Sequence, residues 1–364
     1  MRRTFASLAL LAIVATSAQA QRAWQTEIGL QGGFTREVAA GSGADPTDAI
    51  SLPGFNLGPA LPFASGVYAI IPWKNKIAVD FDLGVSQLTG GLTATLFQLG
   101  ARGDYAVTDH VYGAAGGALG YISNSGISET QLGLQGALGY RLGLSNSLKG
   151  RVEFRATFWG NTENVGPIDT YSLLFGVATS THRSAAASRR PRVPGAWVPT
   201  LGFSAGYSNI HAVGAGADLT VLAFPSFGGG LANVFGPVLV QPPTVFAILP
   251  IGNKIAIEPG VDINRSQAGG TTTFLGNFSA RLDYAVAGRW YAAAGGNLNY
   301  IKTTGTDAAT RTGANIAWGY RFPFPGALTG RVELNYTLFA KNTDVGLPPV
   351  NVLGLMLGLG MPLR

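Results

Sequence analysis

The sequence predicts an all-β fold: a transmembrane antiparallel up-and-down β-barrel made of two eight-stranded repeats, with one sixteen-stranded barrel as the alternative. First, residues 101–122 (ARGDYAVTDHVYGAAGGALGYI) return as residues 280–301 (ARLDYAVAGRWYAAAGGNLNYI), with 14 of 22 positions identical. Second, apolar and polar residues alternate along both copies, which is the period of a half-buried strand. Third, the chain has 52 glycines and 12% charged residues, yet no run after residue 20 approaches the roughly 18 apolar residues of a membrane helix.

Residues 1–20 predict a secretory signal peptide. Arg2 and Arg3 precede an apolar run at 8–15, and Ala18-Gln19-Ala20 has the small-residue pattern of a cleavage site. We therefore expect the exported chain to begin at Gln21. Because the sequence has no cysteine, no disulfide framework is available to stabilise it.

The first repeat is predicted to occupy residues 21–177. Its expected strands, of about 10 to 14 residues, suit tilted membrane strands better than the five or six residues usual in soluble sheets. Short turns at 73–75, 108–109 and 143–149 alternate with longer loops, the longest at 37–63, as in an outer-membrane barrel. The eight expected strands are residues 24–35, 64–73, 76–87, 92–107, 110–123, 129–142, 150–161 and 168–177.

A basic linker rich in Ala, Ser and Pro at 178–196 leads to the second repeat at 197–364, which follows the same plan. Trp197 corresponds to Trp24, and Gly319-Tyr320-Arg321 corresponds to Gly139-Tyr140-Arg141. The linker could span about 60 Å when extended, whereas one merged barrel would need only a short turn. The linker length therefore favours two separate barrels.

The alternation gives each strand one bulky apolar face and one face that is small or ionised. In one strand, Leu132, Leu134 and Leu138 alternate with Gln131, Gln135 and Arg141. A soluble lipocalin-like barrel would place the bulky face inside, but its outer surface would then be unusually poor in Lys and Glu. We therefore expect the apolar rows to face lipid and the polar rows to face the lumen.

Acids and bases balance on the expected lumen face of each repeat. The charges lie mostly within a few residues of the short turns, so they should gather in one half of each barrel. In the first repeat they are Glu27, Asp80, Asp82, Asp104 and Glu153 against Lys76, Arg102, Arg141, Arg151 and Arg155. In the second they are Glu258, Asp262, Asp283 and Glu333 against Lys254, Arg281, Arg311, Arg321 and Arg331.

Two interpretations of these charges stay open: a salt-bridged plug, or a selective or gated conduit. The plug is favoured because charges buried in a narrow barrel must be paired to offset a desolvation cost of several kcal/mol each. We expect Arg102 to pair with Asp104 on the same face.

The signal, alternating strands, short turns and ionic lumen resemble the small OmpA- and OmpX-like outer-membrane β-barrels, with the unit duplicated in tandem. The resemblance implies a non-enzymatic integral protein of a Gram-negative-type outer membrane, with a structural or surface-interaction role and lipid as its partner. A passive porin-like channel for small polar solutes is one alternative. A secreted, soluble, lipid-binding β-barrel is the other.

We find no pattern for catalysis, a metal or a cofactor. His110, His182 and His211 are not matched between the repeats, and outside the linker the mature chain is close to neutral, which argues against nucleic-acid binding. The first long loops, 50–63 and 219–240, are unusually apolar. Three roles stay open for them: covering the mouth, lying in the lipid interface, or binding a hydrophobic surface ligand.

Overall fold

The computed structural model describes residues 24–39, 46–52, 66–89, 93–124, 127–144, 148–180, 196–213, 217–224, 245–268, 270–323, 328–342 and 348–363. Within these residues no helix is long and apolar enough to cross a membrane. The strands of the first repeat are β1 (Glu27–Ala39), β2 (Thr47–Leu52), β3 (Val67–Lys74), β4 (Ile77–Thr89), β5 (Thr93–Ala106), β6 (Val111–Asn124), β7 (Ile127–Gly143), β8 (Leu148–Trp159) and β9 (Ile168–Ser180). Those of the second are β10 (Thr200–Ala212), β11 (Ala217–Phe224), β12 (Val245–Pro250), β13 (Ile255–Ala268), β14 (Thr271–Ala287), β15 (Trp290–Thr303), β16 (Ala309–Pro323), β17 (Thr329–Phe339) and β18 (Val350–Pro362).

Each repeat closes into an eight-stranded antiparallel barrel, as predicted. The first barrel contains β1 and β3 to β9, and it closes where β1 pairs with β3 on one side and β9 on the other. The second contains β10 and β12 to β18, and it closes where β10 pairs with β12 and β18. The short turns 75–76, 107–110, 251–254 and 288–289 lie at one end of both barrels, which we call the turn end. We call the opposite end the loop end.

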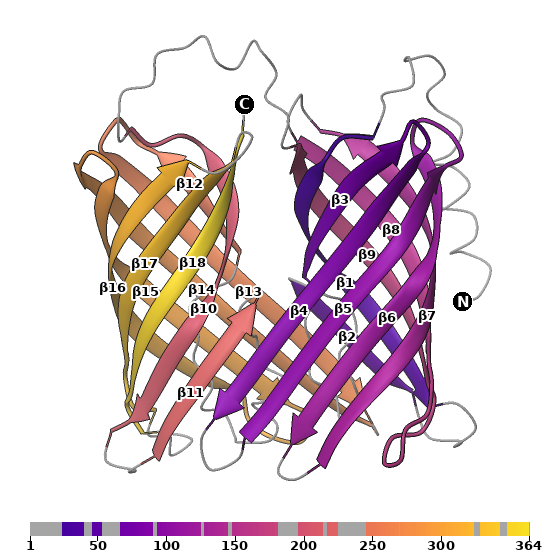
Figure 1. Cartoon of the computed structure of the whole chain (residues 1–364). Coiled ribbons are helices and arrows are strands. Elements are labelled where there is room, and N and C mark those ends of the chain that lie inside the picture. The colour runs from indigo at the N-terminus through magenta and orange to yellow at the C-terminus, as the bar shows by residue number, and fades with distance from the viewer. Residues whose placement is uncertain are drawn as a thin grey trace.

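The two barrels share one wall toward the loop end. There β2 pairs with β1 and with β13 of the other repeat, while β11 pairs with β10 and with β4. The ring at this height runs β1, β2, β13 to β18, β10, β11, β4 to β9, which is sixteen strands. Figure 1 shows two bodies that stand apart at the top and are joined at the bottom, where β11 lies beside β4. The two eight-stranded barrels are therefore separate at the turn end, and their strands join into one sixteen-stranded ring toward the loop end.

The bridging strands were not predicted. β2 lies within the segment 37–63, and β11 overlaps the start of the segment 219–240, both of which were expected to be loops. Each is short, and its second neighbour belongs to the other repeat, so no local pattern reveals the pairing. Residues 53–65 and 225–244 lie outside the described residues, as do residues 1–23, which include the predicted signal peptide, and residues 181–195 of the predicted linker.

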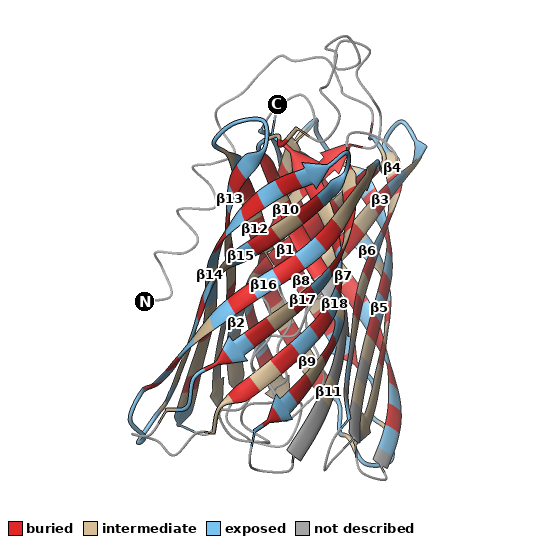
Figure 2. Ribbon diagram, turned by 90° about the vertical axis from the view of Figure 1, so that its left-hand side faces the viewer, coloured by how far each residue is buried: buried red, intermediate tan, exposed pale blue. Residues whose placement is uncertain are grey.

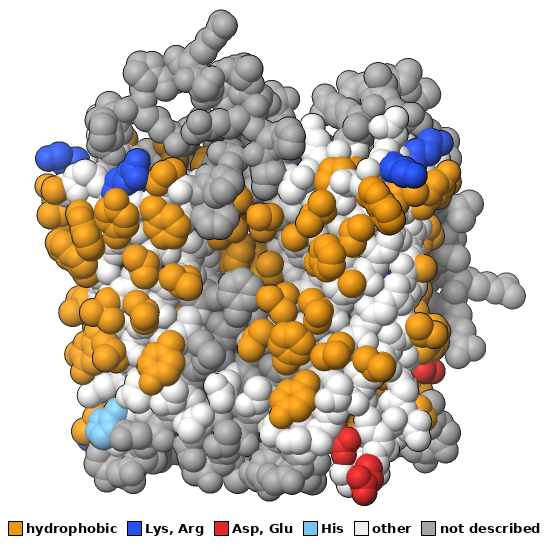
Figure 3. Space-filling view, viewed as in Figure 1, with side chains coloured by type: hydrophobic (Ala, Val, Ile, Leu, Met, Phe, Trp, Pro, Cys, Tyr) orange, Lys and Arg blue, Asp and Glu red, His pale blue; other side chains and the backbone are white. Residues whose placement is uncertain are grey.

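The outer surface is apolar and the interior is polar. Leu132, Leu134 and Leu138 are 68%, 73% and 60% exposed, whereas Gln131 and Gln135, on the opposite face of the same strand, are buried. Figure 2 shows buried and exposed residues alternating along the strands, and Figure 3 shows hydrophobic side chains over the middle of one face, with charged ones toward its two ends. This inverted distribution is that of a membrane-spanning barrel.

Candidate functional site

The lumen of the first barrel is crossed by a buried cluster of ion pairs. Arg102 on β5 donates from Nη2 to Asp80 Oδ2 at 2.5 Å and from Nη1 to Glu153 Oε1 at 2.8 Å. These three side chains have no exposed surface. Arg151 on β8 donates to the same Asp80 Oδ2 at 2.7 Å, and its guanidinium lies 3.5 Å from the ring centre of Tyr68. β4, β5 and β8 are thus tied together across the lumen.

Glu153 is the hub of this cluster. Besides Arg102, it contacts Arg155 Nη2 at 2.7 Å and accepts a hydrogen bond from the Tyr112 hydroxyl at 2.6 Å. Arg155 also reaches Asp82 at 3.3 Å. Gly139 makes room for the phenol, because a Cβ there would lie 2.1 Å from the Tyr112 ring. Charge-assisted bonds from several strands to one carboxylate leave little open cross-section.

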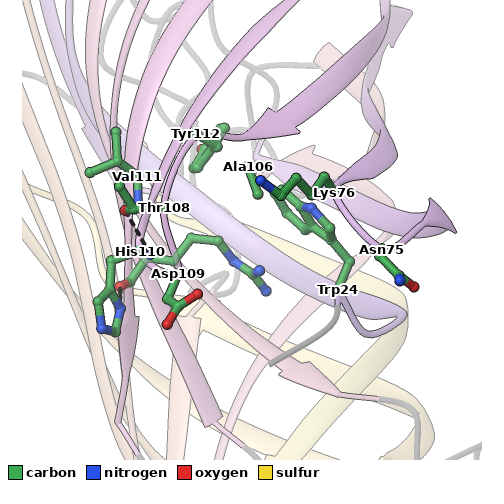
Figure 4. A pocket seen from close by; sticks show the side chains of 10 residues that line it. Trp24, Asn75, Lys76, Ala106, Thr108, Asp109, His110, Val111 and Tyr112 are labelled. Carbon is green, nitrogen blue, oxygen red and sulfur yellow. Dashed lines mark hydrogen bonds between the residues drawn. The ribbon is translucent and has the colours of Figure 1, made fainter. Parts of the chain in front are cut away.

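An aromatic lid covers this cluster toward the turn end. Trp24 meets Tyr112 edge-on at 5.8 Å, and Arg141 lies 4.2 Å over the Trp24 ring while it pairs with Glu27. Figure 4 shows Trp24 and Lys76 facing the turn that carries Asp109 and His110 across a small cavity. The cavity measures about 20 Å³, which is room for about one water molecule.

The second barrel repeats the hub with fewer ions. Arg281 contacts Glu333 at 2.5 Å and Glu258 at 2.9 Å, and Arg331 donates to Glu258 at 2.5 Å. Tyr291 donates to Glu333 at 2.7 Å, as Tyr112 does to Glu153. The lid is repeated by Arg321, which lies 3.8 Å over the ring of Trp197.

Neutral groups replace one ion pair of the first barrel. Gly260 and Asn335 stand in the second barrel where Asp82 and Arg155 stand in the first. A cavity of about 20 Å³ lies beside the second hub, lined by the amides Asn297, Asn315 and Asn335 and by the charged side chains of the hub. The second lumen therefore lacks this ion pair, but it carries the buried charges Asp262 and Arg311 where the first barrel has Gly84 and Gln131.

Most residues of the predicted charge network lie inside the two lumens. Lys76 and Lys254 are exceptions: both lie in exposed turns. Arg281 contacts Asp283 at 3.2 Å, but the expected pairing of Arg102 with Asp104 was wrong, because Arg102 bonds to Asp80 and Glu153. Neither oxygen of Asp104 bonds to any residue that the structure describes. The buried residues of the predicted network are Glu27, Asp80, Asp82, Arg102, Asp104, Arg151, Glu153, Arg155, Glu258, Asp262, Arg281, Asp283, Arg311, Arg331 and Glu333, with Arg141 and Arg321 partly buried.

The aromatic members of the network were not predicted. Tyr112 and Tyr291, and Trp24 and Trp197, occupy corresponding positions in the repeats, and all four are buried. The available signals were a tyrosine that recurs on the polar face of a strand and a tryptophan that recurs three residues before a strand begins.

No family model and no curated protein matches this chain. Among solved structures, the chain is similar to the Pseudomonas putida toluene transporter TodX, at 10% identity and a TM-score of 0.30, over 94% of this chain and 90% of that one. It is also similar to OmpT, an outer membrane protein of Vibrio cholerae, at 10% identity and a TM-score of 0.27, over 92% and 96%, and to a KdgM porin, at 7% identity and a TM-score of 0.22, over 78% and 99%. Membership of the OmpA- and OmpX-like barrels is not shown by these matches, and similarity this low carries no conclusion about function.

Proposed function

We propose that this chain is a non-enzymatic integral outer-membrane protein whose two barrels are closed to solutes and serve a structural or surface-interaction role. The observation that carries the proposal is the buried ion-pair cluster across each lumen, centred on Glu153 and Glu333. Eight-stranded barrels have interiors that side chains can fill. Here the filling is ionic and bonded to several strands, so opening it would expose unpaired charges.

Two observations support the membrane placement. The outer faces carry exposed Leu, Phe and Trp, which a soluble barrel would bury, and the first 20 residues have the pattern of a secretory signal. With short turns on the periplasmic side, the sixteen-strand ring would face the cell exterior. A secreted, soluble, lipid-binding barrel is disfavoured because its apolar face would have to line the lumen.

A porin-like channel is the second candidate, since a ring of sixteen strands is wide enough for an aqueous channel. That ring occupies only the loop end, and each path toward the turn end meets a hub. The channel therefore requires the hubs to open.

Planar-bilayer recording tests the choice, preceded by cell fractionation. We expect the protein in the outer-membrane fraction, with heat-modifiable migration, and no large stable conductance. Arg102→Ala/Glu153→Ala and its counterpart Arg281→Ala/Glu333→Ala should each raise conductance by emptying one hub. Large, stable conductance from the parent would establish the channel, and recovery in the soluble fraction would refute the membrane placement.

A further inference from the structure

The two lumens differ most in one row of side chains above the hubs, toward the loop end. In each barrel, three inward positions on adjacent strands are paired directly across the sheet. The row is Gln98, Gly120 and Gln131 in the first barrel, and Asn277, Asn299 and Arg311 in the second. It continues on the next strand to Gly84 in the first barrel and to the buried Asp262 in the second, which is the position farthest from Arg311 along these four strands.

In the first barrel this row is filled by the protein itself. Gln131 donates from Nε2 to the carbonyl oxygens of Gly160 and Gly166, at 3.0 and 3.3 Å. The buried indole of Trp159 covers Gly120 so closely that a Cβ there would lie 3.2 Å from the ring. Gln98 also makes no side-chain hydrogen bond within the described part of the chain, but it is fully buried and its neutral amide offers no positive charge to an anion.

In the second barrel the same row carries polar atoms that are not bonded. Arg311 is only 4% exposed, yet none of Nε, Nη1 and Nη2 donates a hydrogen bond within the described part of the chain. Asn299, its direct partner on β15, has both Nδ2 and Oδ1 buried and without a hydrogen bond there. The counterpart of Trp159 is the smaller Phe339, which packs against Gly313 on β16.

We propose that Arg311 and Asn299 form a binding site for a small carboxylate in the lumen of the second barrel. A buried guanidinium without a partner has lost its hydration without compensation, so an anion that restores its hydrogen bonds is strongly favoured. The planar fork of an arginine matches the two oxygens of a carboxylate, and the Asn299 amide on the next strand adds a neutral donor. The cross-strand pairing holds both groups on a rigid wall.

The site goes beyond the proposed function, because a closed barrel with a structural role does not need to bind a carboxylate. Binding at this site requires only that the second barrel is folded. The same carboxylate chemistry could come from the chain itself, since Asp344 belongs to segment 343–347, outside the described residues. The experiment must therefore separate a free carboxylate from this side chain.

The probe is ¹³C-labelled acetate, whose NMR transverse relaxation is measured in the presence of the folded chain in detergent micelles. The chain used lacks the predicted signal peptide. We expect saturable broadening with a dissociation constant in the millimolar range, displaced by unlabelled acetate and absent for acetamide, which has the same shape without the charge. Arg311→Gln installs the residue of the first barrel and should weaken binding by about tenfold or more. Arg311→Lys, which keeps the charge but loses the fork, and Asn299→Gly should each weaken it severalfold.

The matched control is Arg36→Gln, which also removes one arginine charge but from an exposed side chain already paired with Asp48 at 2.7 Å. It should bind acetate as the parent does. Heat-modifiable migration confirms that each variant is folded. If folded Arg311→Gln binds acetate as tightly as the parent, the site is overturned. A gain of about tenfold in acetate affinity in Asp344→Asn would also overturn it, because it would show that Arg311 already binds an internal carboxylate. Unchanged binding in Asp344→Asn supports the site.

Discussion

The two barrels share a hub but differ above it. In both, a buried glutamate accepts hydrogen bonds from a tyrosine hydroxyl and from an arginine that reaches it across the lumen: Glu153 from Tyr112 and Arg102, and Glu333 from Tyr291 and Arg281. Toward the loop end, the first barrel continues with Arg155 and Asp82, whereas the second continues with amides, the buried Asp262 and an Arg311 that makes no hydrogen bond within the described residues. The comparison shows that the hub is kept in both repeats, whereas the side chains of the lumen above it differ.

The largest expected effect tests the difference in the number of arginine contacts between the two hub glutamates. Glu153 lies against Arg102 at 2.8 Å, Arg155 at 2.7 Å and Arg151 at 3.9 Å, whereas Glu333 forms an ion pair with Arg281 alone among the residues that the structure describes. Glu153→Gln leaves these guanidinium groups short of a counter-charge and should lower the free energy of unfolding by about 3–5 kcal/mol, more than Glu333→Gln does. Urea titration of each folded variant in detergent measures this. Equal losses would mean that the extra arginine contacts contribute nothing to stability.

The next prediction asks whether the barrels are alike on the outside. Leu134 on β7 and Ile316 on β16 face outward near the middle of their strands and are 73% and 59% exposed. Leu134→Arg and Ile316→Arg should each cost about 2–4 kcal/mol when the protein folds into lipid vesicles, with Leu134→Ala and Ile316→Ala as controls for the lost side chain. If the arginine variants fold into vesicles as readily as the alanine variants, these faces do not contact lipid.

A smaller and equal effect should come from the two hub phenols. Tyr112→Phe and Tyr291→Phe each remove one hydroxyl that donates to a buried carboxylate, at 2.6 and 2.7 Å. Each should cost about 1.5–3 kcal/mol, the range for hydrogen bonds to charged groups. Two values that differ by more than about 1 kcal/mol in the same urea assay would show that the two phenol hydrogen bonds do not contribute equally.

The strands and their faces could be predicted because they depend on local alternation. Leu134 and Gln135 differ by one position, and the period of two sends them to opposite sides of the wall. The partners of each charge could not be predicted in this way. Arg102 and Asp104 share a face, but the long arginine side chain crosses the lumen to Glu153 on β8, and that choice depends on how the barrel closes.

The shared wall could not be predicted from the local sequence pattern either, because it also depends on how distant strands pair. β11 pairs with β4, and Thr220 lies opposite Thr89, more than a hundred residues away in the sequence. Six or eight residues of strand do not encode which edge they join. The linker length favoured separate barrels, and the barrels are indeed separately closed at the turn end, but it carried no information about the loop end.

Disulfide mapping tests the shared wall most directly, because the chain has no native cysteine. The register places Thr89 opposite Thr220 and Asp48 opposite Gln267, and directly opposed strand residues have Cα separations that a disulfide can bridge. Oxidation should therefore cross-link Thr89→Cys with Thr220→Cys, and Asp48→Cys with Gln267→Cys, so that the halves stay joined after proteolysis in the linker. If the two barrels were wholly separate, β2 would continue the line of β3 and pair with β4, which would place Asp48 opposite Thr89. Efficient cross-linking of Asp48→Cys with Thr89→Cys, and none between the repeats, would contradict the shared wall.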